Sequence, residues 1–164
     1  MGQGKPIILS SGLATLEEIS ACLDFIKGVD ASYISKGKVA VLQCTSMYPI
    51  PDEDANLNVM STLRQATGLP VGYSNHTVGT EALEVAVAMG AEILEMHFTD
   101  TREGKSFRDH KVSLTKKEVE GLIAKIARIR RLQGSFEKKP TPAEIENGHV
   151  ASFRRGLYPA RALR

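Results

Sequence analysis

The sequence lacks features that mark several large classes of protein. No apolar run approaches the roughly 20 residues needed to cross a bilayer, so we expect no membrane-spanning segment. Residues 1–5 carry no secretion signal, and we therefore expect the cytoplasm as the compartment. Cys22 and Cys44 match neither a CxxC motif nor a disulfide framework, which favours free buried thiols.

A strong charge imbalance is missing as well. The 21 Lys and Arg residues against 19 Asp and Glu give a net charge of +2, which gives no sign of a nucleic-acid partner. No GxGxxG or GxxxxGK(S/T) motif follows a predicted strand, which weakens nucleotide-binding interpretations. What remains is an ordinary globular composition, 42% hydrophobic and 24% charged, in 164 residues.

Short apolar runs alternate with helical patterns along the chain. The predicted strands are 6–10, 39–42, 71–73 and 92–95, each followed by apolar residues at helical spacing. This alternation predicts an α/β fold with a parallel sheet of four βα units. A doubly wound sheet and a TIM barrel both fit the pattern, and four units are only half of a closed barrel.

The helix boundaries have sequence signals of their own. Thr15 with Glu18, and Thr115 with Glu118, have the spacing of capping boxes. Gly28 is placed to end the first long helix.

Two histidines follow successive predicted strands. His76 comes after the third strand and His97 after the fourth. Neighbouring parallel strands lie about 5 Å apart, so both imidazoles could reach one cation. Two histidines with open positions suit zinc, iron, nickel or manganese and leave room for substrate. The pair alone is a weak signal, and structural or substrate-binding histidines are the alternative.

Other polar side chains are predicted near the same edge of the sheet. Glu95 lies two residues before His97, so both share a strand face, where a carboxylate in a barrel interior needs a partner. Asp109 lies in the polar loop 99–112, which could also be a plain solvated connection. Ser10 precedes a helix N-terminus, where it suits anion binding but also simple capping.

In order, these segments resemble the sialic acid synthases, also called N-acetylneuraminate synthases. The matching stretches are 5–15, 43–49, 52–57, 70–79, 95–99, 109–114 and 140–144. The resemblance implies a TIM barrel followed by a small antifreeze-like domain. Residues 1–134 would then be the C-terminal half of the barrel, and residues 135–164 a tail leading toward the antifreeze-like domain.

The resemblance also implies a reaction and a site. The reaction condenses phosphoenolpyruvate with an N-acetylmannosamine-like sugar to a nonulosonic acid and phosphate. His76 and His97 would hold a divalent metal, Mn²⁺ or Mg²⁺, with Glu95 as a further catalytic residue. Substrate-binding roles are implied for Ser10, Ser46, Tyr48, Ser74 and Asp109. A homodimer is expected, because a half barrel leaves two sheet edges unpaired.

The sequence departs from the family pattern at three positions. Asn75 stands where Asp is usual, which removes a negative charge beside the metal site. Ser46 replaces a common Asn. Met96 replaces a common Lys and is expected to point away from the site by strand alternation.

Three other functions stay open at this point. One is a legionaminic or pseudaminic acid synthase, which uses the same chemistry on another sugar. Another is a non-catalytic half barrel that binds a metal or a partner. The last is a metal-dependent aldolase or hydrolase on the same fold.

Overall fold

The computed structural model describes residues 4–148 and divides the chain into two compact units, Met1–Gln133 and Gly134–Arg164. The described part of the second unit carries one short helix, α7 (Pro142–Glu146), which begins with a capping box between Thr141 and Glu144. Within residues 4–148, no helix is long and apolar enough to cross a membrane.

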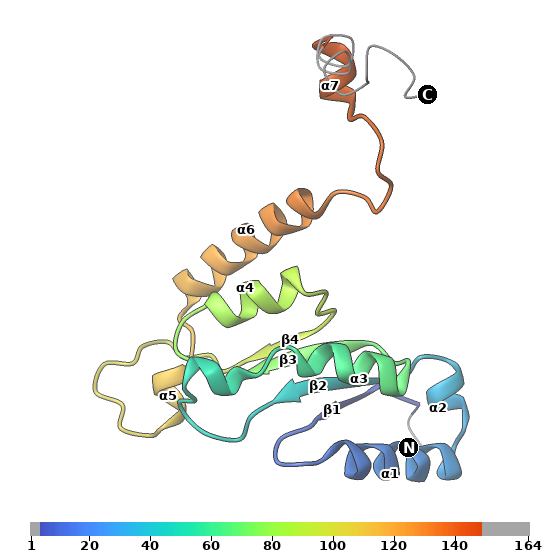
Figure 1. The fold of residues 1–164 in the computed structure, drawn as a ribbon. Coiled ribbons are helices and arrows are strands. Elements are labelled where there is room, and N and C mark those ends of the chain that lie inside the picture. The colour runs from blue at the N-terminus through green and yellow to red at the C-terminus, as the bar shows by residue number, and fades with distance from the viewer. Residues whose placement is uncertain (1–3, 149–164) are drawn as a thin grey trace. The chain divides into compact units, whose positions relative to one another are not determined.

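Strands and helices alternate through the first unit (Figure 1). In chain order the elements are β1 (Ile7–Ser10), α1 (Leu16–Val29), α2 (Ser32–Ser35), β2 (Val39–Cys44), the 3-10 helix η1 (Asp52–Ala55), α3 (Val59–Thr67), β3 (Val71–Asn75), α4 (Glu81–Ala88), β4 (Leu94–Met96), α5 (Asp109–Val112) and α6 (Lys116–Gln133). The strands form one parallel sheet in the order β1-β2-β3-β4. The predicted set of four parallel βα units is therefore confirmed.

Three local predictions need correction. Helix α1 starts with the predicted Thr15–Glu18 capping box but does not end at Gly28, since it continues to Val29. A glycine inside a helix costs only about 1 kcal/mol, which the burial of Ile26 in the same turn can outweigh. The fourth strand lies further along the chain than 92–95, and the polar loop 99–112 contains the one-turn helix α5.

One face of the sheet is closed by the chain's own helices. Alternate strand residues on this face are buried in the hydrophobic core. They are Val39 and Val41 of β2, Val71 and Tyr73 of β3, with Leu94 and Met96 of β4 packed against the core. The helices contribute Ile26, Leu63, Leu83 and Leu122. Burying such a side chain stabilises the fold by about 1.5–3 kcal/mol, so this layer holds the unit together.

The opposite face of the sheet is strongly concave. The Ser10 hydroxyl of β1 donates a hydrogen bond to the Glu95 carboxylate of β4 at 3.1 Å. In a flat sheet these strands would lie three spacings apart, about 14 Å. At the centre of the concave face, a Cβ on Gly72 would lie 2.2 Å from the carbonyl oxygen of Ile93, so the close approach requires glycine. The sheet thus curves as one side of a barrel does.

Candidate active site

The two predicted histidines lie side by side at the carboxyl ends of neighbouring strands. His76 follows β3, His97 follows β4, and their ring centroids are 5.3 Å apart. His76 is buried, with 4% of its surface exposed. The His97 side chain is 31% exposed. His76 therefore lies at the buried end of the site, and His97 lies at its partly exposed end.

A backbone carbonyl fixes the orientation of His76. Its Nδ1 lies 2.7 Å from the carbonyl oxygen of Thr45. A carbonyl can only accept, so we assign the ring proton to Nδ1, and the lone pair is then on Nε2. Metal-binding histidines commonly hold their second nitrogen in this way. No sequence signal marks Thr45 for this role, because the contact uses its main chain.

The turn that carries His76 is fixed by its two neighbours. The Asn75 side-chain oxygen accepts hydrogen bonds from the Thr77 N–H at 3.1 Å and the Thr77 hydroxyl at 2.8 Å. The Asn75 amide donates to the Thr77 carbonyl at 3.3 Å. An Asp could not make this last bond, because an ionised carboxylate only accepts. The departure at position 75 therefore serves the turn, and both side chains are buried.

A closed loop brings Asp109 to His97. The Leu114 N–H donates to the His97 carbonyl at 2.8 Å, and the Thr99 N–H donates to the Leu114 carbonyl at 3.0 Å. These bonds join the two ends of the loop between β4 and α6, the excursion formed by residues 99–113. Within it, the Asp109 carboxylate lies 3.7 Å from His97 Nδ1, which is an ion-pair distance rather than a hydrogen bond.

Tyr48 lies between the two histidines and the loop. Its ring centroid is 4.0 Å from that of His76 and 5.5 Å from that of His97, the latter edge to face. The Arg108 guanidinium also stacks on Tyr48, with its central carbon 4.9 Å from the Tyr48 ring centroid. Burial, followed by the neighbouring Cys44 and Asp109, raises the pKa of the Tyr48 phenol above its usual value. The phenol is therefore protonated at neutral pH and can donate a hydrogen bond.

The remaining predicted site residues form a second group, Ser10, Ser74 and Glu95, with Ser46 outside it. Glu95 is exposed on the concave face, where it accepts a hydrogen bond from the Ser10 hydroxyl. Ser74 is buried and lies opposite Glu95 in the strand register. Ser46 is exposed, next to Gly12 in the loop after β1. Met96 packs against the hydrophobic core, as strand alternation predicts.

The donors at the histidine pair fit a metal only in part. Among residues 4–148, no group of three or more His, Cys, Asp or Glu side chains is arranged to hold an ion. His76 and His97 supply two nitrogen donors, each with Nδ1 facing an oxygen acceptor. Two imidazoles suit a catalytic metal whose other positions belong to water and substrate.

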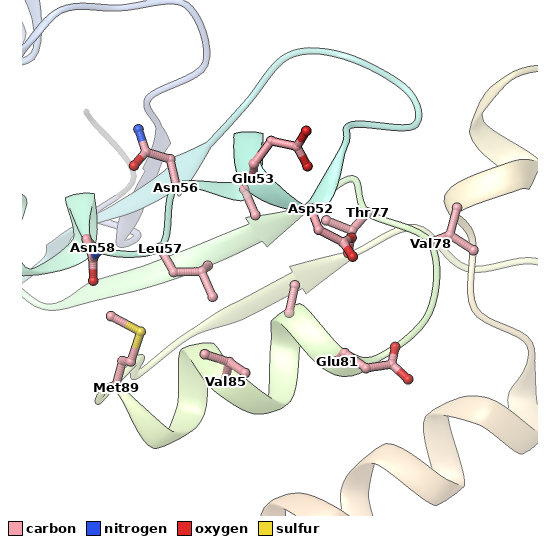
Figure 2. A pocket seen from close by; sticks show the side chains of 12 residues that line it. Asp52, Glu53, Asn56, Leu57, Asn58, Thr77, Val78, Glu81, Val85 and Met89 are labelled. Atoms are coloured by element: carbon pink, nitrogen blue, oxygen red, sulfur yellow. The ribbon is translucent and has the colours of Figure 1, made fainter.

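Two cavities lie on opposite sides of the sheet. One of about 420 Å³ opens on the concave face and is lined by Ile8, Ser10, Leu42, Ile93, Leu94, Glu95 and Met96. The other, of about 530 Å³, lies on the helical side between the η1–α3 segment and α4, as Figure 2 shows. None of the predicted site residues lines the second cavity, whereas Ser10 and Glu95 line the first, and the histidine pair lines neither.

Comparison with known proteins identifies the family. The family model described as NeuB family matches residues 1–138. The chain belongs to the NeuB family. N,N'-diacetyllegionaminic acid synthase of Legionella pneumophila is 38% identical over 85% of this chain and 39% of its own length. N-acetylneuraminate-9-phosphate synthase of Mus musculus is 33% identical over 87% of this chain and 38% of its own length.

A solved structure supports the fold of this NeuB-family chain. The N-acetylneuraminic acid synthetase of Leptospira borgpetersenii, solved with citrate, is 35% identical with a TM-score of 0.78. The match covers 92% of this chain and 50% of that chain. The predicted barrel-type α/β fold and the resemblance to sialic acid synthases are thereby confirmed. The chain spans less than half the length of the curated relatives it matches.

Proposed function

We propose that this chain carries the sugar-binding and metal-binding part of a site that condenses phosphoenolpyruvate with an N-acetylmannosamine-like sugar. The products are a nonulosonic acid and inorganic phosphate. The observation that carries the proposal is the convergence of His76, His97, Tyr48 and Asp109 at the carboxyl ends of β2 to β4. This is the edge at which barrel enzymes place their chemistry. NeuB-family relatives named for a product are sugar-acid synthases.

The reaction joins three carbons to six. The enol carbon of phosphoenolpyruvate forms a bond with the aldehyde carbon of the open sugar, and the aldehyde oxygen gains a proton. Water adds to the neighbouring carbon, and the bond from that carbon to the phosphate oxygen breaks. Holding both substrates in attack geometry can remove roughly 7–11 kcal/mol of the barrier.

His76 and His97 are the metal ligands in this proposal. A divalent metal, Mn²⁺ or Mg²⁺, bound there would supply Lewis-acid activation of the sugar aldehyde. The Thr45 carbonyl orients His76, and Asp109 faces the corresponding nitrogen of His97. The His76 ring is thus oriented before any ligand arrives, whereas His97 has only an ion-pair contact.

The other predicted residues bind substrate in this proposal. Glu95 and Asp109 would accept hydrogen bonds from the sugar hydroxyls, and Tyr48 would cover one side of the sugar. Ser10 and Ser74 would donate to the carboxylate or phosphate of phosphoenolpyruvate. Glu95 and Ser10 already share a hydrogen bond, so the two substrates would meet at the concave face.

We also propose that the chain forms a homodimer. The strands β1 and β4 are the two edges of the parallel sheet, and neither has a second strand partner among the described residues. Ile8 on β1 is 57% exposed on the concave face. A second copy would cover this apolar surface and pair the free edges.

A phosphate-release assay tests the proposed reaction. The chain is incubated with phosphoenolpyruvate, N-acetylmannosamine and Mn²⁺, with a chelator control. We expect release that vanishes with chelator and in His76→Ala, while Lys116→Ala, which removes an exposed charge on α6, leaves it unchanged. Mn²⁺ titration provides a second readout that does not need turnover. Binding that persists in the His76→Ala, His97→Ala double variant would contradict the proposal.

One observation favours a second sugar. Among the relatives described above, the legionaminic acid synthase shares more identity with this chain than the neuraminate phosphate synthase, 38% against 33%. A diacetylated amino sugar in the same assay separates the two. Faster turnover of the diacetylated sugar would assign the chain to legionaminic acid synthesis.

A further inference from the structure

The cavity between the η1–α3 segment and α4 has an apolar end. Its volume of about 530 Å³ falls within the range of small-molecule sites, about 300–1,000 Å³. Leu57, Val85 and Met89 line the end where α4 finishes (Figure 2). Val85 is 48% exposed and Met89 is 36% exposed. This end of the cavity therefore offers open apolar surface to a ligand.

The other end of the cavity is acidic. Asp52, Glu53 and Glu81 lie toward the end where α4 begins, and no Lys or Arg among the described residues lines the cavity. Glu81 is already in use, since its carboxylate accepts a hydrogen bond from the Thr80 N–H at 2.9 Å and attracts Lys125. Within residues 4–148, the carboxylates of Asp52 and Glu53 have no hydrogen bond or ion pair. Their negative charge is left without a counter-charge.

A buried hydroxyl in the same layer also has no partner. Tyr73 is fully buried on the helical face of β3, on which both α3 and α4 pack. Its hydroxyl makes no hydrogen bond to any atom of the described residues. Burial, then Cys44 and then Asp52, raises the pKa of the Tyr73 phenol to about 12. Because buried hydroxyls normally have a partner, this region lacks a polar group that a bound molecule, or a water held by it, would supply.

We propose that this cavity is a second binding site, which takes a small organic cation with an apolar body. The positively charged group would lie against Asp52 and Glu53, and the apolar body would cover Val85 and Met89. This inference does not depend on the proposed function, because none of the residues assigned to the condensation site lines the cavity.

Other classes of ligand fit the cavity less well. An anion such as phosphate would be repelled by the carboxylates. A neutral sugar would leave the acidic end without a counter-charge and the apolar end without an apolar partner. A bare metal ion would lack a ligand set, since no group of three or more His, Cys, Asp or Glu side chains in residues 4–148 is arranged to hold one. An ammonium group on a hydrocarbon body matches both ends at once.

Four small probes separate charge from apolar contact. Phenethylamine is a cation with an apolar ring, phenethyl alcohol is its neutral counterpart, hydrocinnamate is an anion with the same ring, and ethylamine is a cation without it. Each is titrated into the chain, and amide NMR spectra report both the dissociation constant and the location of binding. We expect phenethylamine to bind about fivefold more tightly than the alcohol, which is what a partly exposed ion pair contributes. The anion and ethylamine should both bind more weakly than phenethylamine, and the amide shifts should centre on Leu57, Val85 and Met89.

Two variants alter the two ends of the cavity separately. The double variant Asp52→Asn, Glu53→Gln should weaken phenethylamine binding by about fivefold and leave binding of the alcohol within about twofold. Val85→Ser should weaken both probes alike, by about threefold, because it removes apolar contact alone.

The double variant Asp24→Asn, Glu120→Gln is the matched control. It removes the same number of negative charges from exposed positions on α1 and α6, outside the cavity. The preference for phenethylamine over the alcohol should survive in this variant. A preference that falls equally in both double variants would reveal a general charge effect and overturn the inference.

Two results with the wild-type chain would also overturn it. One is equal affinity for phenethylamine and the alcohol. The other is a set of amide shifts centred on Ser10 and Glu95, which would place the binding on the concave face instead. Neither result bears on the proposed function, which phosphate release tests separately.

Discussion

The two faces of the sheet are built by alternate residues of the same strands, yet they meet different surroundings. On the helical face, Val41 and Tyr73 are fully buried under the chain's own helices. On the concave face, Ile8 is 57% exposed, and Ser10 and Glu95 have only each other. The first face stabilises the unit, and the second carries the cavity lined by Ser10 and Glu95. The stabilising core and the proposed substrate site are therefore separated by the two-residue period of a strand.

The helical face should respond most strongly to loss of volume. Leu63 on α3 is 1% exposed, and Leu63→Ala should lower the free energy of unfolding by about 3 kcal/mol, from lost burial and the cavity left behind. Urea denaturation measures this. Leu132→Ala on α6, 75% exposed, should cost less than about 0.5 kcal/mol. Equal losses of unfolding free energy in the two variants would show that the core does not lie on the helical face.

The concave face should respond to added volume at its centre. Gly72→Ala puts a methyl group 2.2 Å from the Ile93 carbonyl oxygen and 2.6 Å from a Leu42 methyl. Such overpacking should cost about 2 kcal/mol in the same denaturation assay. Gly121→Ala on α6 meets nothing within 4 Å and should instead stabilise by about 0.5 kcal/mol. A neutral Gly72→Ala would mean that the sheet can flatten.

Acid should weaken the link between the site loop and α6. The Arg102 guanidinium, with the Thr115 backbone and hydroxyl, lowers the pKa of Glu118 to about 2 from the usual 4.5. The folded state therefore gains stability from Glu118 above pH 4.5, and this gain is lost as the pH falls toward 2. In Glu118→Gln the free energy of unfolding should fall less steeply over this window. Both side chains are 37% exposed, so added salt should reduce the difference.

The smallest change in stability is expected at the rim of the concave face. Ile8→Ser should alter the free energy of unfolding by less than about 0.5 kcal/mol, since the side chain is already exposed. Its effect should appear in association, as a shift from dimer to monomer measured by light scattering. A wild-type chain that is monomeric at all concentrations would refute the homodimer.

The fold was largely predictable because its signals are local. The strands are short apolar runs, and each is followed by a helix with a clear apolar period. His76 and His97 were predictable as neighbours, because parallel strand ends meet at one edge of the sheet. The fourth strand was misplaced because only three residues pair regularly there.

The supporting contacts of the site were not predictable in the same way. Thr45 acts through its carbonyl, which every residue has. Asn75 and Thr77 bond to each other around His76, and their sequence alone also fits a glycosylation signal. Arg108 stacks on Tyr48 only because the loop folds back over that ring. These contacts depend on the path of the chain between elements, which periodicity does not encode.

The excursion 99–113 is tied at its base to the strand that holds His97, and this has an evolutionary consequence. Because Thr99 and Leu114 close the loop with main-chain bonds, residues between them can be inserted, deleted or exchanged without moving β4. The closing bonds use main-chain atoms, and the Leu114 side chain anchors the base of the loop in the core. The sequence of this loop can therefore change while the positions of His76 and His97 stay the same. Under the proposed function, changes in this loop would alter the sugar that is accepted while His76 and His97 stay in place.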